Sequence, residues 1–531
     1  MKKFVLLLTL LLISLFAFSN TLSMISSVSG SFQKNFNPYF NSGTTYTSKG
    51  FIYETLFYIN GYTGETSPWL AKEYKWADDL MSMTVDLRND VYWHDGEKFN
   101  SDDVINTFEM IKNFPALDTG SVWKNGLEKV EKVDDYKIKF ILNKINTLAT
   151  QDLFSVYIVP KHIWGDLEDP SKYADENPIG TGAFKLDQFT SQVFTLIKND
   201  KYWQEEKVHV DKIRIPAFTG NDTAQLALMN GEIDWGTINF PNMEKIFVGR
   251  DKKHNHYWLP GGNPVAVYFN LSQEPFSNKE FRRAIAHAMD TDQIILMAMT
   301  NYASKANPVG IKEGFSNLID NSQKNNWFKK DIDKAKNILK NLGYKEGRDG
   351  IFQDQNGKKL SFELMVPAGW TDWIAVTQLV SSQAKKIGVD LIVSQVDFGS
   401  YMQKIKAKDY QMAVSWSTYG ESPYNFYENF MHSKNAYSGS NRSGWTDEKT
   451  DELIDVFRST SDENKRKDAM FELQEILLEN IPAVLLFYNP VWFEYSTKNF
   501  TGWPSEENNY TSPRITGMDK MAIILNLKPV K

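Results

Sequence analysis

The sequence predicts an α/β protein with more than one compact lobe. At 531 residues the chain is longer than a single hydrophobic core normally sustains, so two or more lobes are expected. Strand-like alternation and helix-like periodicity follow each other along the chain, which is typical of α/β architecture with some parallel strand pairing. No Pro/Ser-rich spacer, low-complexity segment or repeat marks a boundary between lobes.

Residues 360–396 form the clearest strand-helix-strand unit. Apolar residues alternate over 360–366, which predicts a strand. Asp372 is a candidate N-cap for a helix that ends near Ile387, and Gly388 suits the position after the helix. Residues 389–396 then return as a second strand, so we expect a right-handed crossover between parallel neighbours.

Residues 67–104 carry a second readable pattern. Met81, Met83, Val85 and Leu87 alternate with polar residues, which predicts a half-buried strand. Asp95-Gly96 is a tight-turn dipeptide that leads toward a helix. From physical patterns alone, this is an ordinary element of an α/β domain.

The first 19 residues have the features of a secretion signal. Lys2 and Lys3 precede a mostly apolar run over 4–18, and small residues precede a cleavage point after Ser19. The run is short for a bilayer-spanning helix, so we expect a cleaved signal peptide at 1–19; an uncleaved anchor is the alternative. Cleavage removes two lysines and moves the formal net charge from -7 to -9, which gives no reason to expect nucleic acid as a partner.

The chain contains no cysteine. It therefore has no disulfide framework, no thiol nucleophile, no Cys-based metal site and no cysteine that could carry a lipid anchor. A pair of histidines, His254 and His256, has no third ligand nearby in the sequence, so we expect no metal site. Walker, dinucleotide-binding and nucleophile-elbow motifs are also absent from the sequence, and we expect no cofactor and no catalytic residues.

Several motifs, in a fixed order, resemble one protein family. They are Pro68, Leu70-Ala71, Leu87-Arg88, Trp93-His-Asp-Gly96 and Asp103-Val104, then Pro178-Ile-Gly-Thr-Gly182 and Asn199-Asp-Lys-Tyr-Trp203, then Phe269-Asn270, Pro275-Phe276 and the run from Phe281 to Asp290, and last Trp416 and Trp445-Thr-Asp447. Together they span almost the whole mature chain. The sequence resembles the extracytoplasmic oligopeptide-binding family of ABC-importer solute receptors.

This resemblance implies a two-lobed periplasmic-binding-protein fold with an extra inserted domain and a ligand cleft between the lobes, which close by hinge motion. Carried over to this chain, it gives lobe I as 20–57 plus 179–262 plus 490–531, the inserted domain II as 58–178 and lobe III as 263–489. The implied partners are a captured solute and the permease subunits of an importer. We expect a monomer in the periplasm, without a lipid anchor.

One departure from the family pattern bears on the ligand. Peptide-binding members carry a Trp-x-x-Asp sequence whose carboxylate pairs with the peptide's α-ammonium, because a buried cation needs compensation. Here the run is Trp416-Ser-Thr-Tyr419, and a tyrosine offers no charge. A shift of the role to Glu421 is the alternative. We therefore predict a short β-linked oligosaccharide, such as a cello- or manno-oligosaccharide, as the ligand.

The aromatic content of 14% supplies candidate sugar-stacking residues, since sugar C–H faces pack on aromatic rings. On the lobe III side we expect ligand contacts from Trp370, Trp373, Trp416, Tyr419 and Asn425, the last in a segment, 421–427, that resembles a loop. On the opposite wall the candidates are Asn37, Trp235 and Trp258, and Gly261-Gly262 is a plausible hinge crossing. Core packing, or a structural turn for the two asparagines, is the alternative for each.

Two other functions remain open at this point. The first is an oligopeptide receptor of the same family, in which Glu421 or another acid binds the ammonium. The second is a secreted glycoside hydrolase, which needs two carboxylates roughly 5 to 10 Å apart. With 66 Asp and Glu residues some such pair always looks available, so the sequence does not support this activity.

Overall fold

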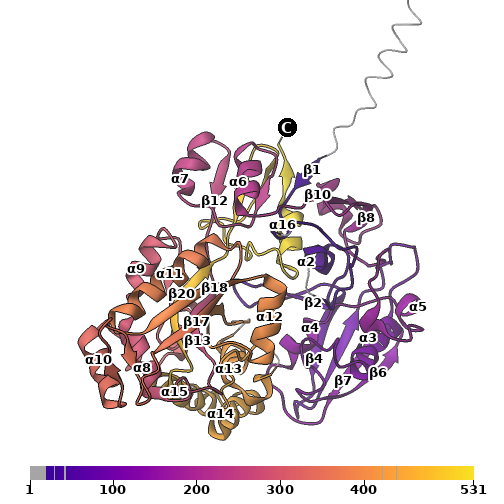
Figure 1. Cartoon of the computed structure of the whole chain (residues 1–531). Coiled ribbons are helices and arrows are strands. Elements are labelled where there is room, and N and C mark those ends of the chain that lie inside the picture. The colour runs from indigo at the N-terminus through magenta and orange to yellow at the C-terminus, as the bar shows by residue number, and fades with distance from the viewer. Residues whose placement is uncertain (1–19, 29, 41–42, 421, 438, 531) are drawn as a thin grey trace, which may run out of the picture.

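The computed structural model describes residues 20–530 except 29, 41–42, 421 and 438. The predicted signal peptide and Glu421 lie outside these described residues. The chain forms a two-lobed α/β protein with a third, inserted part (Figure 1). We keep the predicted names lobe I, domain II and lobe III for these parts; their residue boundaries stay a prediction.

Lobe I is assembled from three segments that are distant in sequence, visible as indigo, magenta and yellow ribbons at the top of Figure 1. Its two sheets have the strand orders β1-β10-β9-β8 and β11-β21-β12, and a bridge between Met24 and Trp235 joins them. The strands are β1 (Thr21–Ser23), β8 (Phe184–Phe189), β9 (Val193–Lys198), β10 (Lys212–Pro216), β11 (Trp235–Gly236), β12 (Asn255–Tyr257) and β21 (Glu494–Ser496). Its helices include α2 (Gly43–Phe51), α6 (Asn221–Met229), α7 (Met243–Ile246) and α16 (Asp519–Asn526).

Domain II is built on an antiparallel sheet of order β4-β5-β7-β6. The predicted strand is confirmed as β5, with Met83, Val85 and Leu87 buried. Gly96 has a φ of 98°, as the predicted tight turn requires, and a capping box at Asn100 starts the helix that follows. The elements are β4 (Ala71–Trp76), β5 (Ser82–Leu87), β6 (Leu127–Asp134), β7 (Lys137–Leu142), α3 (Ser101–Asn113), α4 (Ala149–Phe154), α5 (Lys161–Trp164) and a hairpin of β2 (Phe57–Ile59) with β3 (Thr66–Pro68).

Lobe III is built on one six-stranded sheet of order β14-β20-β13-β19-β17-β18. The chain passes from β12 of lobe I into β13 and from β20 back to β21 of lobe I, so we call β13 and β20 the hinge strands, following the predicted hinge near Gly261-Gly262. The strands are β13 (Gly261–Phe269), β14 (Ser304–Lys305), β17 (Ser361–Pro367), β18 (Asp390–Val396), β19 (Met412–Trp416) and β20 (Ala483–Pro490). The helices are α8 (Lys279–Ala288), α9 (Thr291–Met297), α10 (Ile332–Asn341), α11 (Thr371–Lys386), α12 (Phe398–Ala407), α13 (Pro423–Met431), α14 (Glu448–Ser459) and α15 (Glu463–Asn480).

The predicted strand-helix-strand unit of lobe III is confirmed, with two corrections. Strands β17 and β18 pair in parallel, and Gly388 has a φ of 82° after helix α11. Asp372 is not the N-cap, because α11 begins at Thr371 and the cap residue is Trp370. The segment 421–427 is not simply a loop, because Pro423, which suits the first turn of a helix, begins α13.

The hydrophobic cores show which parts are joined most firmly. Lobe I and domain II share one continuous apolar cluster, which includes Phe184 and Met521 from the former and Val85 and Phe140 from the latter. Lobe III has separate clusters on the two faces of its sheet. Among the described helices, none combines the length and the apolar character needed to cross a bilayer.

Candidate functional site

The edge of the lobe III sheet that faces lobe I is where three strands end. Strand β17 pairs in parallel with both β18 and β19, so their last residues, Pro367, Val396 and Trp416, lie at the same edge. Helix α11 leaves β17 and packs on one face through Trp373 and its neighbours, whereas α12 leaves β18 and packs on the other face through Tyr401. Ligands of open α/β sheets bind outside the carboxyl ends of the strands, so this edge is a candidate binding site.

Four aromatic side chains meet at this edge and form what we call the cleft aromatic cluster: Trp370, Trp373, Phe398 and Trp416. The rings of Trp370, Phe398 and Trp416 are nearly parallel, with interplanar angles of 23°, 30° and 19° and centroid separations of 5.3, 6.0 and 6.3 Å. Trp373 meets Trp370 edge-on at 5.0 Å. The structure therefore brings together three of the residues predicted from the sequence.

The members of the cluster differ in how much surface they present. Phe398 is 41% exposed and Trp373 is 4% exposed, whereas Trp370 and Trp416 are partly buried. The indole Nε1 of Trp373 donates a hydrogen bond to Asn489 Oδ1 at 3.3 Å, which ties Trp373 to a hinge strand. Trp373 thus supports the rings that have exposed surface.

Arg442 fixes the orientation of Trp416. Its guanidinium lies 4.2 Å from the centre of the Trp416 ring, and its Nε donates a hydrogen bond to the Trp416 carbonyl. Such a cation–π contact is worth roughly 0.5 to 2 kcal/mol. Because Arg442 is itself only 3% exposed, Trp416 is held before any ligand arrives.

An acidic residue of lobe III reaches lobe I beside the cluster. The side chain of Asn239, which follows β11 of lobe I, lies near enough to the Asp372 carboxyl to lower its pKa. Burial is the larger effect and raises the pKa of Asp372 to about 6. Polar side chains of lobe I and lobe III therefore approach each other here.

Tyr419 lies in the core of lobe III, 1% exposed. Its hydroxyl accepts a hydrogen bond from the Lys312 N–H at 3.0 Å, and its own N–H donates to Asn263 Oδ1 at 3.0 Å. The Lys312 ammonium lies 4.4 Å from the ring centre, and burial raises the pKa of the phenol. In this arrangement Tyr419 holds the chain after β19 against the hinge strand β13.

The remaining predicted residues lie outside the cluster. Asn425 is in the first turn of α13, where its Oδ1 accepts from Ser422 Oγ at 2.8 Å. Asn37 is fully buried, and its Nδ2 donates to the Tyr173 carbonyl at 2.8 Å. Trp235 is also fully buried in lobe I, edge-on to Phe493 and Trp503. In this conformation neither Asn37 nor Trp235 presents surface to a ligand.

Trp258 lines a different concavity, which we call the back groove. It has a volume of about 1120 Å³ and lies between lobe I, at Trp258 and Tyr495, and lobe III, at Ser304 and Lys305. Strand β14 is separated from β19, β17 and β18 by the hinge strands β20 and β13. The groove therefore borders the β14 edge of the sheet and is lined by none of the four cluster residues, although Lys312, whose N–H bonds to Tyr419, also lines it.

Phe398 was not anticipated from the sequence. Asp397 caps α12 by accepting hydrogen bonds from the N–H groups of Gly399 and Ser400. This cap puts Phe398 in the first turn, directly at the strand edge. One sequence feature could have indicated Phe398: it is a large apolar residue between a capping aspartate and a glycine, directly after a predicted strand.

In the described part of the chain, no three His, Asp or Glu side chains lie close enough together to hold a metal ion.

Known proteins resemble this chain over nearly its whole length. The family described as bacterial extracellular solute-binding proteins, family 5 (middle), matches residues 65–438. The dipeptide-binding protein of Escherichia coli is 26% identical over 511 residues, covering 88% of this chain and 90% of that protein. The oligopeptide-binding protein AppA of Bacillus subtilis is 26% identical, covering 79% and 77%.

Solved structures agree with this relationship. The periplasmic oligopeptide-binding protein of an oligopeptide ABC transporter from Thermotoga maritima, crystallised with mannohexaose bound, superposes with a TM-score of 0.89 at 26% identity and covers 97% of this chain and 99% of its own. AppA of Bacillus subtilis, in complex with a nonapeptide, superposes with a TM-score of 0.80 at 21% identity and shares the fold. The relatives are binding proteins of transporters and not enzymes. The chain therefore belongs to the bacterial extracellular solute-binding proteins of family 5, the extracytoplasmic receptors of ABC importers.

Proposed function

We propose that this receptor captures a short oligosaccharide, β-linked as in cello- or manno-oligosaccharides, by closing its lobes and delivers it to the permease. The observation that carries the proposal is the near-parallel arrangement of Trp370, Phe398 and Trp416 at the edge of the lobe III sheet. Sugar rings present apolar C–H faces that pack on such aromatic surfaces, while their hydroxyls need polar partners at the edge. Asp372 and Asn239 supply such partners beside the rings.

The environment of Tyr419 supports the same conclusion. A peptide ligand brings an α-ammonium group, and burying that charge without a carboxylate costs several kcal/mol. The phenol of Tyr419 carries no charge, and its oxygen already accepts the Lys312 N–H. A neutral sugar has no charge that a carboxylate must compensate.

The structural relative from Thermotoga maritima adds support, because that protein was crystallised with mannohexaose and is 26% identical to this chain. An oligopeptide is the second candidate ligand, favoured by the relatives from Escherichia coli and Bacillus subtilis, which are a dipeptide-binding and an oligopeptide-binding protein. In that case Glu421, which lies outside the described residues, or Asp372 is the candidate partner of the ammonium.

The proposal includes the place where the receptor works. We propose a periplasmic monomer, released by cleavage after Ser19 and without a lipid anchor, since the chain has no cysteine to carry one. Its partner is the permease of an importer in the cytoplasmic membrane.

The test is a titration of tryptophan fluorescence in the protein that begins at Asn20. One series uses β-1,4-linked gluco- and manno-oligosaccharides of two to six units, and the other uses peptides of two to five residues. Saturable binding to sugars alone, with the sugar recovered intact, supports the proposal. Binding to peptides alone, lost when their N-termini are acetylated, contradicts it and assigns the ligand to the second candidate.

A further inference from the structure

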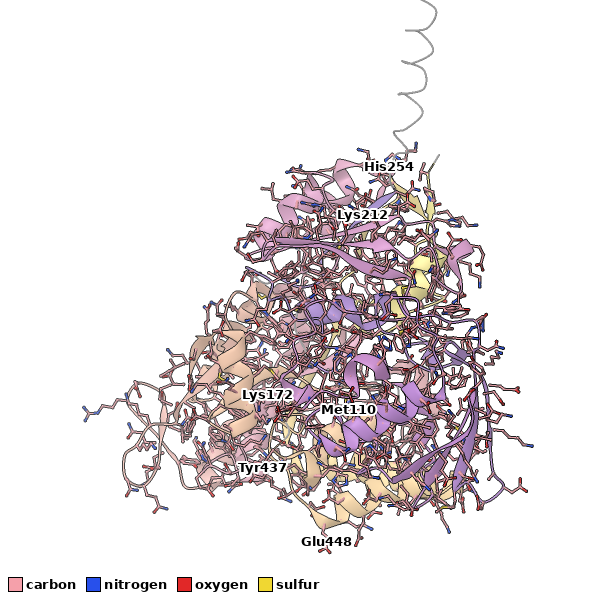
Figure 2. The ribbon with its side chains drawn as sticks, turned by 90° about the vertical axis from the view of Figure 1, so that its right-hand side faces the viewer. Met110, Lys172, Lys212, His254, Tyr437 and Glu448 are labelled. Carbon is pink, nitrogen blue, oxygen red and sulfur yellow. The ribbon has the colours of Figure 1, made fainter. Side chains whose placement is uncertain are left out.

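Domain II touches lobe III far from the hinge strands. Domain II shares its core with lobe I, so these two parts move as one body, while lobe III is joined to them through β13 and β20. Any contact between domain II and lobe III is therefore made or broken when the lobes rotate. Figure 2 looks onto domain II, with Met110 of α3 in front and Glu448, the first residue of α14 in lobe III, at the bottom.

Most of the contact is made by residues 146–152, which lead into and form the start of α4. Lys434 Nζ of lobe III also donates to Asn125 Oδ1 of domain II at 3.4 Å. The Thr147 N–H donates a hydrogen bond to the Arg458 carbonyl at 2.8 Å, and its hydroxyl donates to the Phe457 carbonyl at 3.3 Å. Leu148, 5% exposed, packs into the lobe III cluster that contains Tyr424 and Phe457. Domain II thus inserts a side chain into the core of lobe III.

An ion pair lies at the centre of this contact. The carboxylate of Asp152 in α4 pairs with Arg458 at the end of α14, and Arg458 Nη1 also donates to Asn146 Oδ1 at 3.1 Å. The side chains of Arg458 and Asp152 are only 4% and 10% exposed. A charge-assisted bond shielded from water in this way is stronger than a surface ion pair.

Each half of the pair also has partners within its own part of the molecule. In lobe III, Arg458 pairs with Glu428 at 3.2 Å and donates from Nε to the Tyr424 hydroxyl at 2.6 Å. In domain II, Asp152 accepts from Asn125 Nδ2 at 3.2 Å and from Asn146 Nδ2 at 3.1 Å. Separation of the two parts therefore leaves neither charge without a partner. This arrangement suits a contact that forms and breaks reversibly rather than one required for folding.

We propose that Asp152 and Arg458 form a latch between domain II and lobe III that stabilises the closed receptor and thereby raises its affinity for solute, although neither residue belongs to the cleft aromatic cluster. For a ligand that binds only the closed form, the apparent affinity is the affinity of the closed form multiplied by the fraction of free receptor that is closed. Weakening the latch lowers this fraction. The inference depends on the hinge and on this contact, and it holds whichever solute is bound.

The experiment measures lobe closure without a ligand. The chain has no cysteine, so Val133→Cys in domain II and Ile392→Cys in lobe III, at positions 54% and 60% exposed, give two defined sites for spin labels. Distance distributions from pulsed electron paramagnetic resonance are compared between this background and the same background with Asp152→Asn. The asparagine keeps the shape of the side chain and removes its charge.

We expect the short-distance population to fall at least fivefold in Asp152→Asn. The matched control is Asp290→Asn, which removes the charged partner of Lys330 and the charge at the cap of α9 within lobe III; it should lower the melting temperature and leave the distance distribution unchanged. The latch is overturned if the distance distribution of Asp152→Asn superposes on that of the parent. It is also overturned if the parent itself has no short-distance population. Because no sugar or peptide is added, this result is independent of the proposed solute.

Discussion

The indole rings of Trp370 and Trp416 lie 6.0 Å apart and within 30° of parallel, although they belong to different strand ends of lobe III. They meet because β17 and β19 are parallel neighbours whose carboxyl ends share one edge. Phe398 from the start of α12 extends the same surface. Near-parallel rings held by three separate elements are preorganised, so little conformational entropy is lost when a ring-shaped ligand packs on them.

Removal of either partly buried indole, Trp370 or Trp416, should weaken sugar binding in a protein that still folds. Trp370→Ala and Trp416→Ala are each expected to raise the Kd for the best-binding oligosaccharide at least tenfold, about 1.4 kcal/mol. Isothermal titration calorimetry measures this change without relying on tryptophan fluorescence. The matched control is Trp76→Ala, a partly buried tryptophan at the end of β4 in domain II, which should leave the Kd unchanged. Equal loss of binding in all three variants would contradict the assignment of the cleft.

Trp373 should behave differently from its neighbours, because it is 4% exposed and bonded to Asn489. Trp373→Ala is expected to weaken sugar binding at least tenfold and also to lower the free energy of unfolding by about 3 to 5 kcal/mol, since it leaves a cavity beneath Trp370 and Trp416. Denaturant unfolding and calorimetry on the same sample separate the two effects. An unchanged Kd in a folded Trp373→Ala variant would remove this residue from the site.

Tyr419→Phe tests whether the phenol contacts ligand or only holds the fold. The substitution removes the hydrogen bond from the Lys312 N–H to the phenol oxygen, so the free energy of unfolding should fall by about 1 to 3 kcal/mol. The Kd for sugar should stay within about twofold, because the ring is 1% exposed. A large rise in Kd with unchanged stability would instead make Tyr419 a direct ligand contact.

Local patterns in the sequence predicted the strands and the crossover correctly, because alternation and a glycine after a helix depend only on neighbouring residues. Strand β5, the parallel pair β17 and β18, and the positive φ of Gly388 all follow from such patterns. The family motifs then supplied the order of the lobes, which local patterns do not contain.

The site was harder to predict, because exposure depends on tertiary packing. Trp235 and Trp416 are both tryptophans at strand ends, yet the first is enclosed by Phe493 and Trp503 while the second has exposed ring surface. The Asn37 side chain donates hydrogen bonds to the carbonyls of residues 170 and 173, more than a hundred positions away. Phe398 joins the cluster only because α12 starts at the same sheet edge.

Glu494 should make the stability of the receptor depend on pH. This carboxyl is fully buried near the hinge, its Oε1 has no partner among the described residues, and burial raises its pKa to about 8. Between about pH 4.5 and pH 8 the unfolded chain has lost this proton while the folded chain keeps it, so rising pH favours unfolding. The wild-type free energy of unfolding should therefore fall over this range relative to that of Glu494→Gln, by up to about 1.4 kcal/mol per pH unit.

The measurement is urea unfolding of both proteins at pH 5.0, 6.5 and 8.0. Other buried carboxyls contribute equally to the two proteins, so the difference between them isolates Glu494. A difference that does not change with pH would show that this carboxyl ionises normally in the folded protein.

The back groove offers a way to shift lobe closure at a distance from the cleft aromatic cluster. Strands β20 and β13 separate β14, at the groove, from β19 and β17, at the cluster. Rotation about these strands that moves the cluster away from lobe I should therefore narrow the groove between Trp258 and Tyr495 on one wall and Ser304 and Lys305 on the other. Ser304 is exposed in this groove, so Ser304→Tyr should act as a wedge that hinders opening. The Kd for the best-binding solute should fall, mainly through slower dissociation.

Ser505→Tyr on the lobe I wall is the matched variant and should act in the same direction, because a wedge works from either side. A rise in Kd for both variants would mean that the groove widens as the cleft opens, which would contradict a hinge located at β13 and β20.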